Sequence, residues 1–146
     1  MSVKDKVVII TGAGRGIGAA TARLMASQGG KIVVADINEE GGTAVADSIT
    51  SAGGSAIYAR VDVSDNTQMT GLVERAVKEY GRLDGIVNNA ATIAVAEIEN
   101  LSVEEWDRVM MVNGRGVFLG CKHAIIQFKK QGGGGSIVNI GSISAV

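Results

Sequence analysis

Hydrophobic residues occur in short continuous runs that alternate with longer amphipathic segments. The first run, Val7-Val8-Ile9-Ile10, is apolar and β-branched throughout, which is typical of a strand buried on both faces in a parallel sheet. Similar runs predict further strands at 31–35, 56–61, 85–87 and 136–140. The pattern therefore indicates five short strands.

Segments of helical length separate these runs. Apolar spacing predicts helices over 16–28, 39–52 and 66–80, each followed by glycine that can supply a left-handed stop. In the first of them the apolar positions are Ile17, Ala20, Leu24 and Met25. A fourth, longer helix begins at a capping sequence over 102–105 and runs towards Lys130, with glycines at 114 and 116 that loosen it.

Alternation of strands and helices through short loops predicts a doubly wound α/β fold of the Rossmann type. Its parallel sheet is expected to contain strands one to five and to carry helices on both faces. Ligands of such sheets bind beyond the carboxyl ends of the strands, where the strand order switches. The chemistry is therefore expected at those strand ends.

Composition restricts the class of protein. The 146 residues suit one domain, and a net charge of −1 provides no basic surface for nucleic acid. Cys121 is the single cysteine, and we expect neither a secretory leader nor a membrane span, because no apolar run is long enough. The cytoplasm is the expected location.

A glycine-rich loop follows the first strand directly, with the sequence TGAGRGIG over 11–18. Glycine permits the tight turn there and lets a pyrophosphate approach the amides at the helix N-terminus. An ordinary strand-to-helix turn remains the alternative interpretation. A nucleoside-triphosphate loop is disfavoured, because no Lys-Ser/Thr pair follows the glycines.

Asp36 ends the second strand, 20 residues after Gly16. A carboxylate at that separation can accept hydrogen bonds from the adenosine ribose, which favours NAD over NADP, because the 2′-phosphate of NADP would meet its negative charge. Arg15 is a basic residue that could tolerate NADP, but we give more weight to Asp36. Alternatively, Asp36 is a solvated acid that caps the following turn.

Several separated motifs resemble those of the short-chain dehydrogenase/reductase family. They are TGAGRGIG, Asp36, Asp62-Val63, Asn88-Asn89-Ala90-Ala91, Asn113 and Asn139-Ile140-Gly141-Ser142, and they span the whole chain. Asn89 precedes Asn113 by 24 residues, and Asn113 precedes Ser142 by 29, as the family pattern requires. The resemblance implies a nicotinamide cofactor and an alcohol or ketone as the small-molecule substrate.

The cofactor-binding candidates come from the loop, the strand ends and the resemblance. They are Gly12, Arg15, Gly16, Ile17, Gly18, Asp36, Ile37, Asp62, Val63 and Asn89. The resemblance implies that Asp62 and Val63 contact adenine and that Asn89 steadies the fourth strand. Asp62 could alternatively be a helix cap without a ligand, and Ala90-Ala91 stands where the family has Ala-Gly.

The resemblance also implies two catalytic residues. Asn113 matches an asparagine that interrupts a helix and holds a water in a proton relay, and Ser142 matches a serine that hydrogen-bonds the substrate oxygen; Ser144 is the weaker candidate. The alternatives are a buried polar helix residue with a local backbone partner for Asn113, and a turn-forming serine for Ser142.

The family's Tyr-x-x-x-Lys motif falls beyond Val146, and Tyr58 and Tyr80 lie too far upstream to replace its tyrosine. We therefore expect residues 1–146 to be an NAD(P)-binding Rossmann domain that forms the N-terminal part of a longer domain. The complete protein is expected to be an NAD-dependent oxidoreductase that forms a homodimer or homotetramer. The alternative is a dinucleotide-binding module without catalysis.

The remaining histidine, cysteine, tryptophan and methionine candidates are interpreted as packing residues rather than as catalytic or metal-binding residues. His123 has no second ligand at metal-binding spacing and is expected at a surface or partly buried helix position, so no metal is predicted. Cys121 is interpreted as a small packing residue. Trp106 and Met110-Met111 are expected on a packed helix face.

Overall fold

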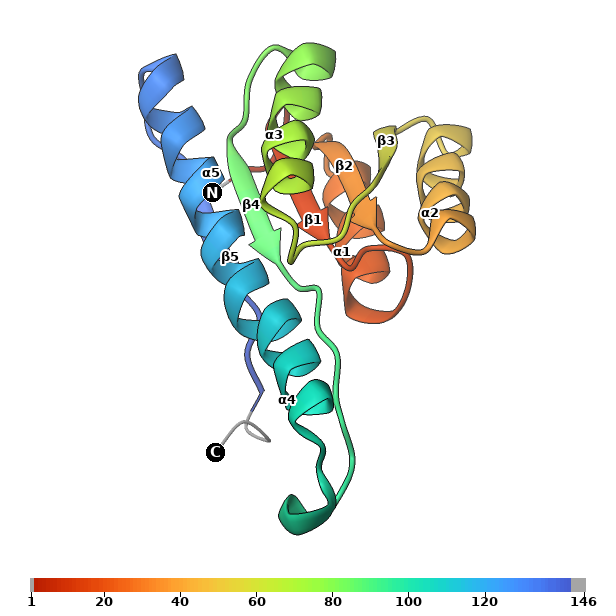
Figure 1. The fold of residues 1–146 in the computed structure, drawn as a ribbon. Coiled ribbons are helices and arrows are strands. Elements are labelled where there is room, and N and C mark those ends of the chain that lie inside the picture. Colours follow the sequence, from red (N-terminus) through yellow and green to blue (C-terminus); the bar gives the residue numbers. More distant parts are fainter. Residues whose placement is uncertain (1, 143–146) are drawn as a thin grey trace.

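The five expected strands form one parallel sheet in the structure, a computed structural model that describes residues 2–142. The strands follow the order β3-β2-β1-β4-β5 across the sheet (Figure 1). Their bounds are β1 (Val7–Thr11), β2 (Lys31–Asp36), β3 (Ser55–Arg60), β4 (Gly85–Asn88) and β5 (Ser136–Asn139). The order switches between β1 and β4, so the prediction of a doubly wound α/β fold is confirmed.

Helices cover both faces of this sheet. They are α1 (Gly16–Ser27), α2 (Glu39–Ser51), α3 (Asn66–Tyr80), the 3-10 turn η1 (Ile98–Asn100), α4 (Val103–Met110), the π-helical segment η2 (Met111–Gly116) and α5 (Val117–Gln131). One core cluster contains α1 and α2, and the other contains α3 and α5. Ile9 belongs to one cluster and Ile10 to the other, which explains why β1 is apolar without alternation.

Helix α1 packs on the sheet through its smallest residues. Ala19, Ala22 and Ala26 are buried, whereas Ile17 is 67 % and Leu24 60 % exposed. The apolar spacing thus predicted the helix correctly but not its buried side. Alanine on that side lets the helix approach the sheet closely, so the large apolar residues are left outside.

The fourth helix is interrupted where the glycines suggested. Helix α4 begins as expected at Ser102, whose side chain accepts a hydrogen bond from the Glu105 N–H at 3.2 Å. The π-helical segment η2 then separates α4 from α5. The prediction of a packed face for Trp106 and Met110 is wrong in the described chain, because their exposed fractions are 52 % and 46 %.

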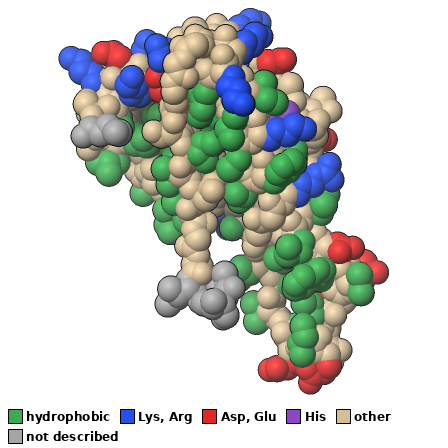
Figure 2. All heavy atoms as spheres, turned by 90° about the vertical axis from the view of Figure 1, so that its left-hand side faces the viewer, with side chains coloured by type: hydrophobic (Ala, Val, Ile, Leu, Met, Phe, Trp, Pro, Cys, Tyr) green, Lys and Arg blue, Asp and Glu red, His purple; other side chains and the backbone are tan. Residues whose placement is uncertain are grey.

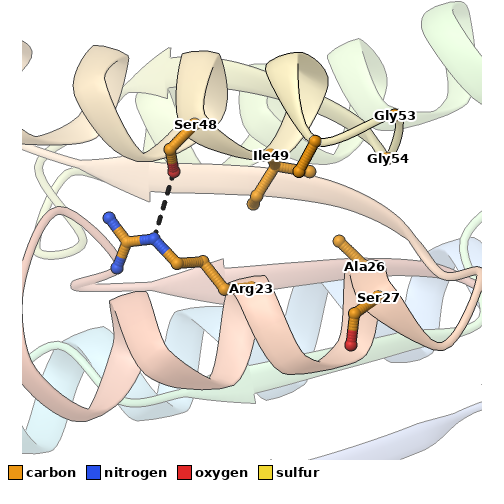
Figure 3. Close-up of a pocket in the computed structure, with 8 residues that line it drawn as sticks. Arg23, Ala26, Ser27, Ser48, Ile49, Gly53 and Gly54 are labelled. Carbon is orange, nitrogen blue, oxygen red and sulfur yellow. Dashed lines mark hydrogen bonds between the residues drawn. The ribbon is translucent and has the colours of Figure 1, made fainter.

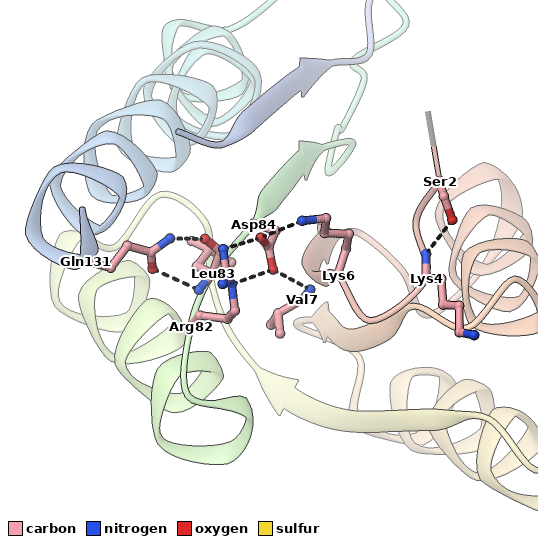
Figure 4. A network of polar contacts seen from close by, with 8 residues as sticks. All are labelled: Ser2, Lys4, Lys6, Val7, Arg82, Leu83, Asp84 and Gln131. Atoms are coloured by element: carbon pink, nitrogen blue, oxygen red, sulfur yellow. Dashed lines mark hydrogen bonds and ion pairs between the residues drawn. The ribbon is translucent and has the colours of Figure 1, made fainter. Parts of the chain in front are cut away.

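A carboxylate at the amino ends of the strands joins the residues that precede β4 to the start of β1 (Figure 4). Asp84, just before β4, accepts hydrogen bonds from the Val7 N–H and the Arg82 Nε, both at 3.0 Å, and pairs with Lys6 at 3.5 Å. Burial alone would raise the pKa of Asp84, but the hydrogen bonds from Val7 and Arg82 and the nearby positive charges hold it below its ordinary value. Asp84 therefore stabilises the junction of β1 and β4 as a carboxylate.

Strand β5 lies at the edge of the sheet and is poorly covered. Val138 and Ile140 are both partly exposed, and hydrophobic side chains gather on the face of the molecule shown in Figure 2. Within the described residues, the outer edge of β5 therefore lacks a neighbouring strand, and apolar surface beside it is exposed. No helix within residues 2–142 is long and apolar enough to cross a membrane.

Candidate functional site

A pocket of about 750 Å³ opens at the carboxyl ends of the strands, beside the switch in strand order. All cofactor-binding candidates except Gly18 line it: Gly12, Arg15, Gly16, Ile17, Asp36, Ile37, Asp62, Val63 and Asn89. Val61, residues 90–92, Arg108 and Val112 complete the wall. The fold thus brings together residues that are far apart in the sequence, such as Gly12 and Asn89, which are 77 positions apart.

The glycine loop has a backbone that other residues would strain. Gly12 and Gly16 have φ angles of +62° and +57°, in the left-handed region that favours glycine. Gly18 lies beneath the loop, where a Cβ would stand 2.6 Å from Asn89 Nδ2 and against the Gly12 carbonyl. The prediction that these glycines permit a tight turn is consistent with this geometry, and Gly18 supports the loop from below rather than lining the pocket.

Helix α1 begins at this loop without a side-chain cap. The side chain of its N-cap residue, Arg15, makes no capping hydrogen bond, and its first turn contains no acidic residue. A helix N-terminus has amide N–H groups without helical partners and a partial positive charge. The start of α1 can therefore accept an anionic group of a ligand in the pocket.

Asp36 is held in a fixed orientation at the end of β2. Its Oδ2 accepts a hydrogen bond from the Gly14 N–H at 2.8 Å, and its Oδ1 accepts one from the Asn38 N–H at 2.9 Å. A Cβ on Gly14 would stand 2.9 Å from Asp36 Oδ2, so glycine permits this approach. Each carboxylate oxygen retains a further lone pair, which allows Asp36 to accept hydrogen bonds from ligand hydroxyls as well as to cap the turn.

Tyr58 supports the backbone of the same strand end. Its hydroxyl donates to the Asp36 carbonyl at 3.0 Å, and its ring packs where a side chain on Gly42 would lie. Burial, followed by the negative charges of Glu39 and Asp36, raises the pKa of Tyr58, so it is a neutral donor. No motif in the sequence indicates this contact, which joins β3 to β2.

Asp62 forms a local turn and lines the pocket, but it does not cap helix α3. Its Oδ1 accepts hydrogen bonds from the Ser64 N–H at 2.9 Å and the Ser64 hydroxyl at 2.7 Å, which is a local turn. Asp62 also lines the pocket together with the buried Val63. The actual cap of α3 is Asp65, whose side chain accepts from the Gln68 N–H.

Asn89 connects the end of β4 to the glycine loop. Its Nδ2 donates to the Thr11 carbonyl at 2.9 Å and to the Gly12 carbonyl at 3.1 Å. The buried Thr11 hydroxyl in turn accepts from the N–H groups of Asn89 and Ala90, at 3.0 and 3.1 Å. These contacts fix the distance between the two strand ends that flank the switch point.

Asn113 lies in the π-helical segment, where regular helix hydrogen bonding is interrupted as the resemblance implied. Its Oδ1 accepts from the Thr92 N–H and its Nδ2 donates to the Thr92 carbonyl, both at 2.9 Å. The alternative of a buried residue with a local partner is wrong, because Asn113 is exposed and Thr92 lies 21 residues away. Asn113 does not line the pocket, although its partner Thr92 does.

The remaining candidates lie elsewhere. Ser142 is exposed just beyond β5 and is not among the pocket-lining residues, and Ser144 lies outside the described residues. His123 is buried rather than at the surface, with its ring Nε2 3.0 Å from Asn66 Oδ1, and burial and the charge of Lys122 lower its pKa. Cys121 is half-buried between α5 and β5, near Asn139.

A second pocket, of about 350 Å³, lies between α1 and α2 (Figure 3). The Arg23 Nε donates to the Ser48 hydroxyl across it at 3.1 Å, and Ile49 and Ala26 form its apolar part. It contains none of the predicted site residues. The candidate site is therefore the larger pocket.

Known proteins resemble both the sequence and the fold. A family model described as short chain dehydrogenase matches residues 6–146. An uncharacterized oxidoreductase of Thermotoga maritima is 38 % identical over 98 % of this chain and 56 % of that protein. Cyclopentanol dehydrogenase of Comamonas sp. is 38 % identical over 97 % of this chain and 56 % of its own length.

The structural comparison gives the same result. The crystal structure of a short-chain type dehydrogenase/reductase from Mycobacterium marinum has a TM-score of 0.95 and 33 % identity. The match covers 99 % of this chain and 58 % of that one. The chain thus spans about half the length of the curated relatives it matches.

Proposed function

Because this chain belongs to the short-chain dehydrogenase family, we propose that its large pocket binds NAD(H) and that the complete polypeptide oxidises an alcohol or reduces a carbonyl group. The observation that carries the proposal is the convergence of the glycine loop, Asp36 and Asn89 on one pocket at the strand ends. Its volume of about 750 Å³ lies within the usual range of ligand pockets, roughly 300–1,000 Å³.

The residues present suit a dinucleotide. The uncapped start of α1 offers amide donors to a pyrophosphate, and Gly12 and Gly16 leave room for its approach. Asp36 offers acceptors to the ribose hydroxyls, and Asp62 and Val63 form the wall proposed for adenine. A bound nicotinamide supplies the hydride donor or acceptor.

Two residues are proposed to act on the reacting groups. Asn113 anchors the π-helical segment to Thr92, and a π turn leaves backbone carbonyls outside the regular helical pattern, free to hold a water. Ser142 is proposed to donate a hydrogen bond to the substrate oxygen. Together they would orient a substrate and its proton path beside the pocket.

Asp36 makes NAD the proposed cofactor rather than NADP. Its carboxylate would repel a 2′-phosphate, whereas Arg15 also lines the pocket and would attract one. Fluorescence titration of the complete polypeptide with NADH and NADPH tests this, and we expect NADH to bind at least tenfold more tightly. Asp36→Asn should reduce the preference for NADH, measured as the ratio of the NADPH and NADH dissociation constants. Glu40→Gln replaces an exposed acid outside the pocket and should leave that ratio unchanged. Tighter binding of NADPH by the wild type would overturn the assignment.

Dinucleotide binding without hydride transfer is the second candidate function. It is favoured by the position of Tyr58 and Tyr80, neither of which lines the pocket to serve as a general acid. Absorbance of NADH during incubation with a panel of alcohols and ketones distinguishes the two. Binding with no turnover by the complete polypeptide would support the second function.

The proposal extends to organisation and location. We propose that residues 1–146 are the N-terminal part of a longer domain, which the intact mass of the denatured protein tests. Exposed Trp106, Phe118 and Ile126 along α4 and α5 support a homodimer or homotetramer, which light scattering would measure.

The cytoplasm is the proposed location, with no nucleic-acid or membrane partner, and fractionation of cells tests this location.

A further inference from the structure

The segment from 89 to 93 forms one wall of the pocket through its residues 89–92, but it has little backbone support. Among residues 2–142, and outside the helices and strands, no backbone-to-backbone hydrogen bond involves positions 89–96. Side chains therefore determine where this wall lies. Thr11 holds its beginning through the N–H groups of Asn89 and Ala90.

The other end of the segment is held at Thr92 by two residues of the following helical region. Asn113 bonds the N–H and carbonyl of Thr92. Arg108, on α4, donates from Nη1 to the Thr92 hydroxyl at 2.6 Å and from Nη2 to the Ile93 carbonyl at 3.1 Å. Arg108 thus spans two successive residues of the wall, and it lines the pocket itself.

The chemistry of the contact favours positioning over charge pairing. Within the part of the chain that the structure describes, the ion pairs are those of Asp84 with Lys6 and Arg82, so Arg108 takes part in none. Its partners are a neutral hydroxyl and a neutral carbonyl. A planar guanidinium can donate to both in a fixed geometry, which a lysine ammonium reproduces poorly.

We propose that Arg108 is a positioning residue that acts through Thr92 to fix the 89–93 wall for the bound dinucleotide. This inference rests on the proposed function, because it assigns the wall to the NAD(H) pocket. Arg108 is exposed and Thr92 half-buried, so their contact contributes little to global stability. Its loss should alter the pocket while the fold persists.

A double-mutant cycle in the complete polypeptide tests the proposal. Thr92→Val removes the hydroxyl while preserving the shape, and Arg108→Met removes the guanidinium. Each should weaken NADH binding about tenfold, and the double variant should bind no more weakly than either one. Arg108→Lys should be intermediate. Arg75→Met, which removes an exposed arginine of α3 outside the pocket, should bind like the wild type.

Two further measurements separate the possible outcomes. Hydrogen exchange without ligand should be faster at 89–93 in Arg108→Met and unchanged in the other strand ends, while the thermal midpoint stays the same. The positioning role would be overturned if the two substitutions had additive effects on NADH affinity, or if hydrogen exchange at 89–93 were the same in Arg108→Met as in the wild type. A thermal midpoint that falls together with NADH affinity would also overturn it. If the wild type does not bind NADH, the proposed function fails, and exchange at 89–93 still decides whether Arg108 holds the wall.

Discussion

Gly18 provides the sharpest test of how the glycine loop is supported. A methyl group there would stand 2.6 Å from Asn89 Nδ2 and 2.9 Å from Ala13 Cα, and it would press on the Gly12 carbonyl. Overpacking costs about 1–3 kcal/mol, and displacing Asn89 loses about 1 kcal/mol for each of its two bonds to the loop. Alanine returns about 1 kcal/mol of helix propensity. Gly18→Ala should therefore lower the free energy of unfolding by about 2–4 kcal/mol.

The matched control is Gly71→Ala, also within a helix, where no atom lies within 4 Å of the added methyl group. This variant should be more stable than the wild type by about 0.5–1 kcal/mol, since only propensity changes. Urea denaturation of the complete polypeptide, followed by circular dichroism, measures both. Equal stability of Gly18→Ala and the wild type would refute the argued contact, as would a comparable loss in Gly71→Ala.

Three other substitutions test separate parts of the molecule. The folded-state pKa of Asp84 is lowered, so its contribution is full above the unfolded pKa and is lost as the pH falls through the folded one. Asp84→Asn should therefore be less stable than the wild type, and the difference in unfolding free energy should be largest near neutral pH and become smaller below about pH 4. Urea denaturation midpoints measured at several pH values would show this. Met69→Ala empties a fully buried site and should cost about 2–5 kcal/mol by the same assay. Asn89→Asp replaces a donor by an acceptor that faces two carbonyls, so it should cost about 2–4 kcal/mol and weaken NADH binding in a thermal-shift titration.

Local sequence patterns were sufficient for the elements of the fold. Continuous apolar runs identified all five strands, because a strand such as β1 is buried on both faces. Glycines identified helix ends, since Gly29, Gly53 and Gly81 all have left-handed φ angles. The buried side of α1 was not predictable from its large apolar residues, because close packing on the sheet selects alanine there.

The sequence predicted those parts of the candidate site in which a short motif lies at the end of a single strand. The glycine loop and Asp36 could be found because each lies at the carboxyl end of a predicted strand. The contact of Arg108 with Thr92 joins residues 16 positions apart across the pocket wall, so neither residue carries a local signal. Tyr58 likewise acts on Asp36 from a neighbouring strand, 22 positions away. Such contacts depend on the tertiary fold.

The π-helical segment between α4 and α5 determines the direction in which the side chains of α5 point about the helix axis, relative to those of α4. We call this rotation the phase between the two helices. In an uninterrupted α-helix, the step from Arg108 to Leu119 would be about 20° more than three full turns. Arg108 contacts the 89–93 wall, and Leu119 is buried in the core cluster that contains α3 and α5. The six residues Met111–Gly116 accommodate more residues per turn and so change this phase. Exchanging α4 between relatives would therefore require the π turn to move with it as one unit.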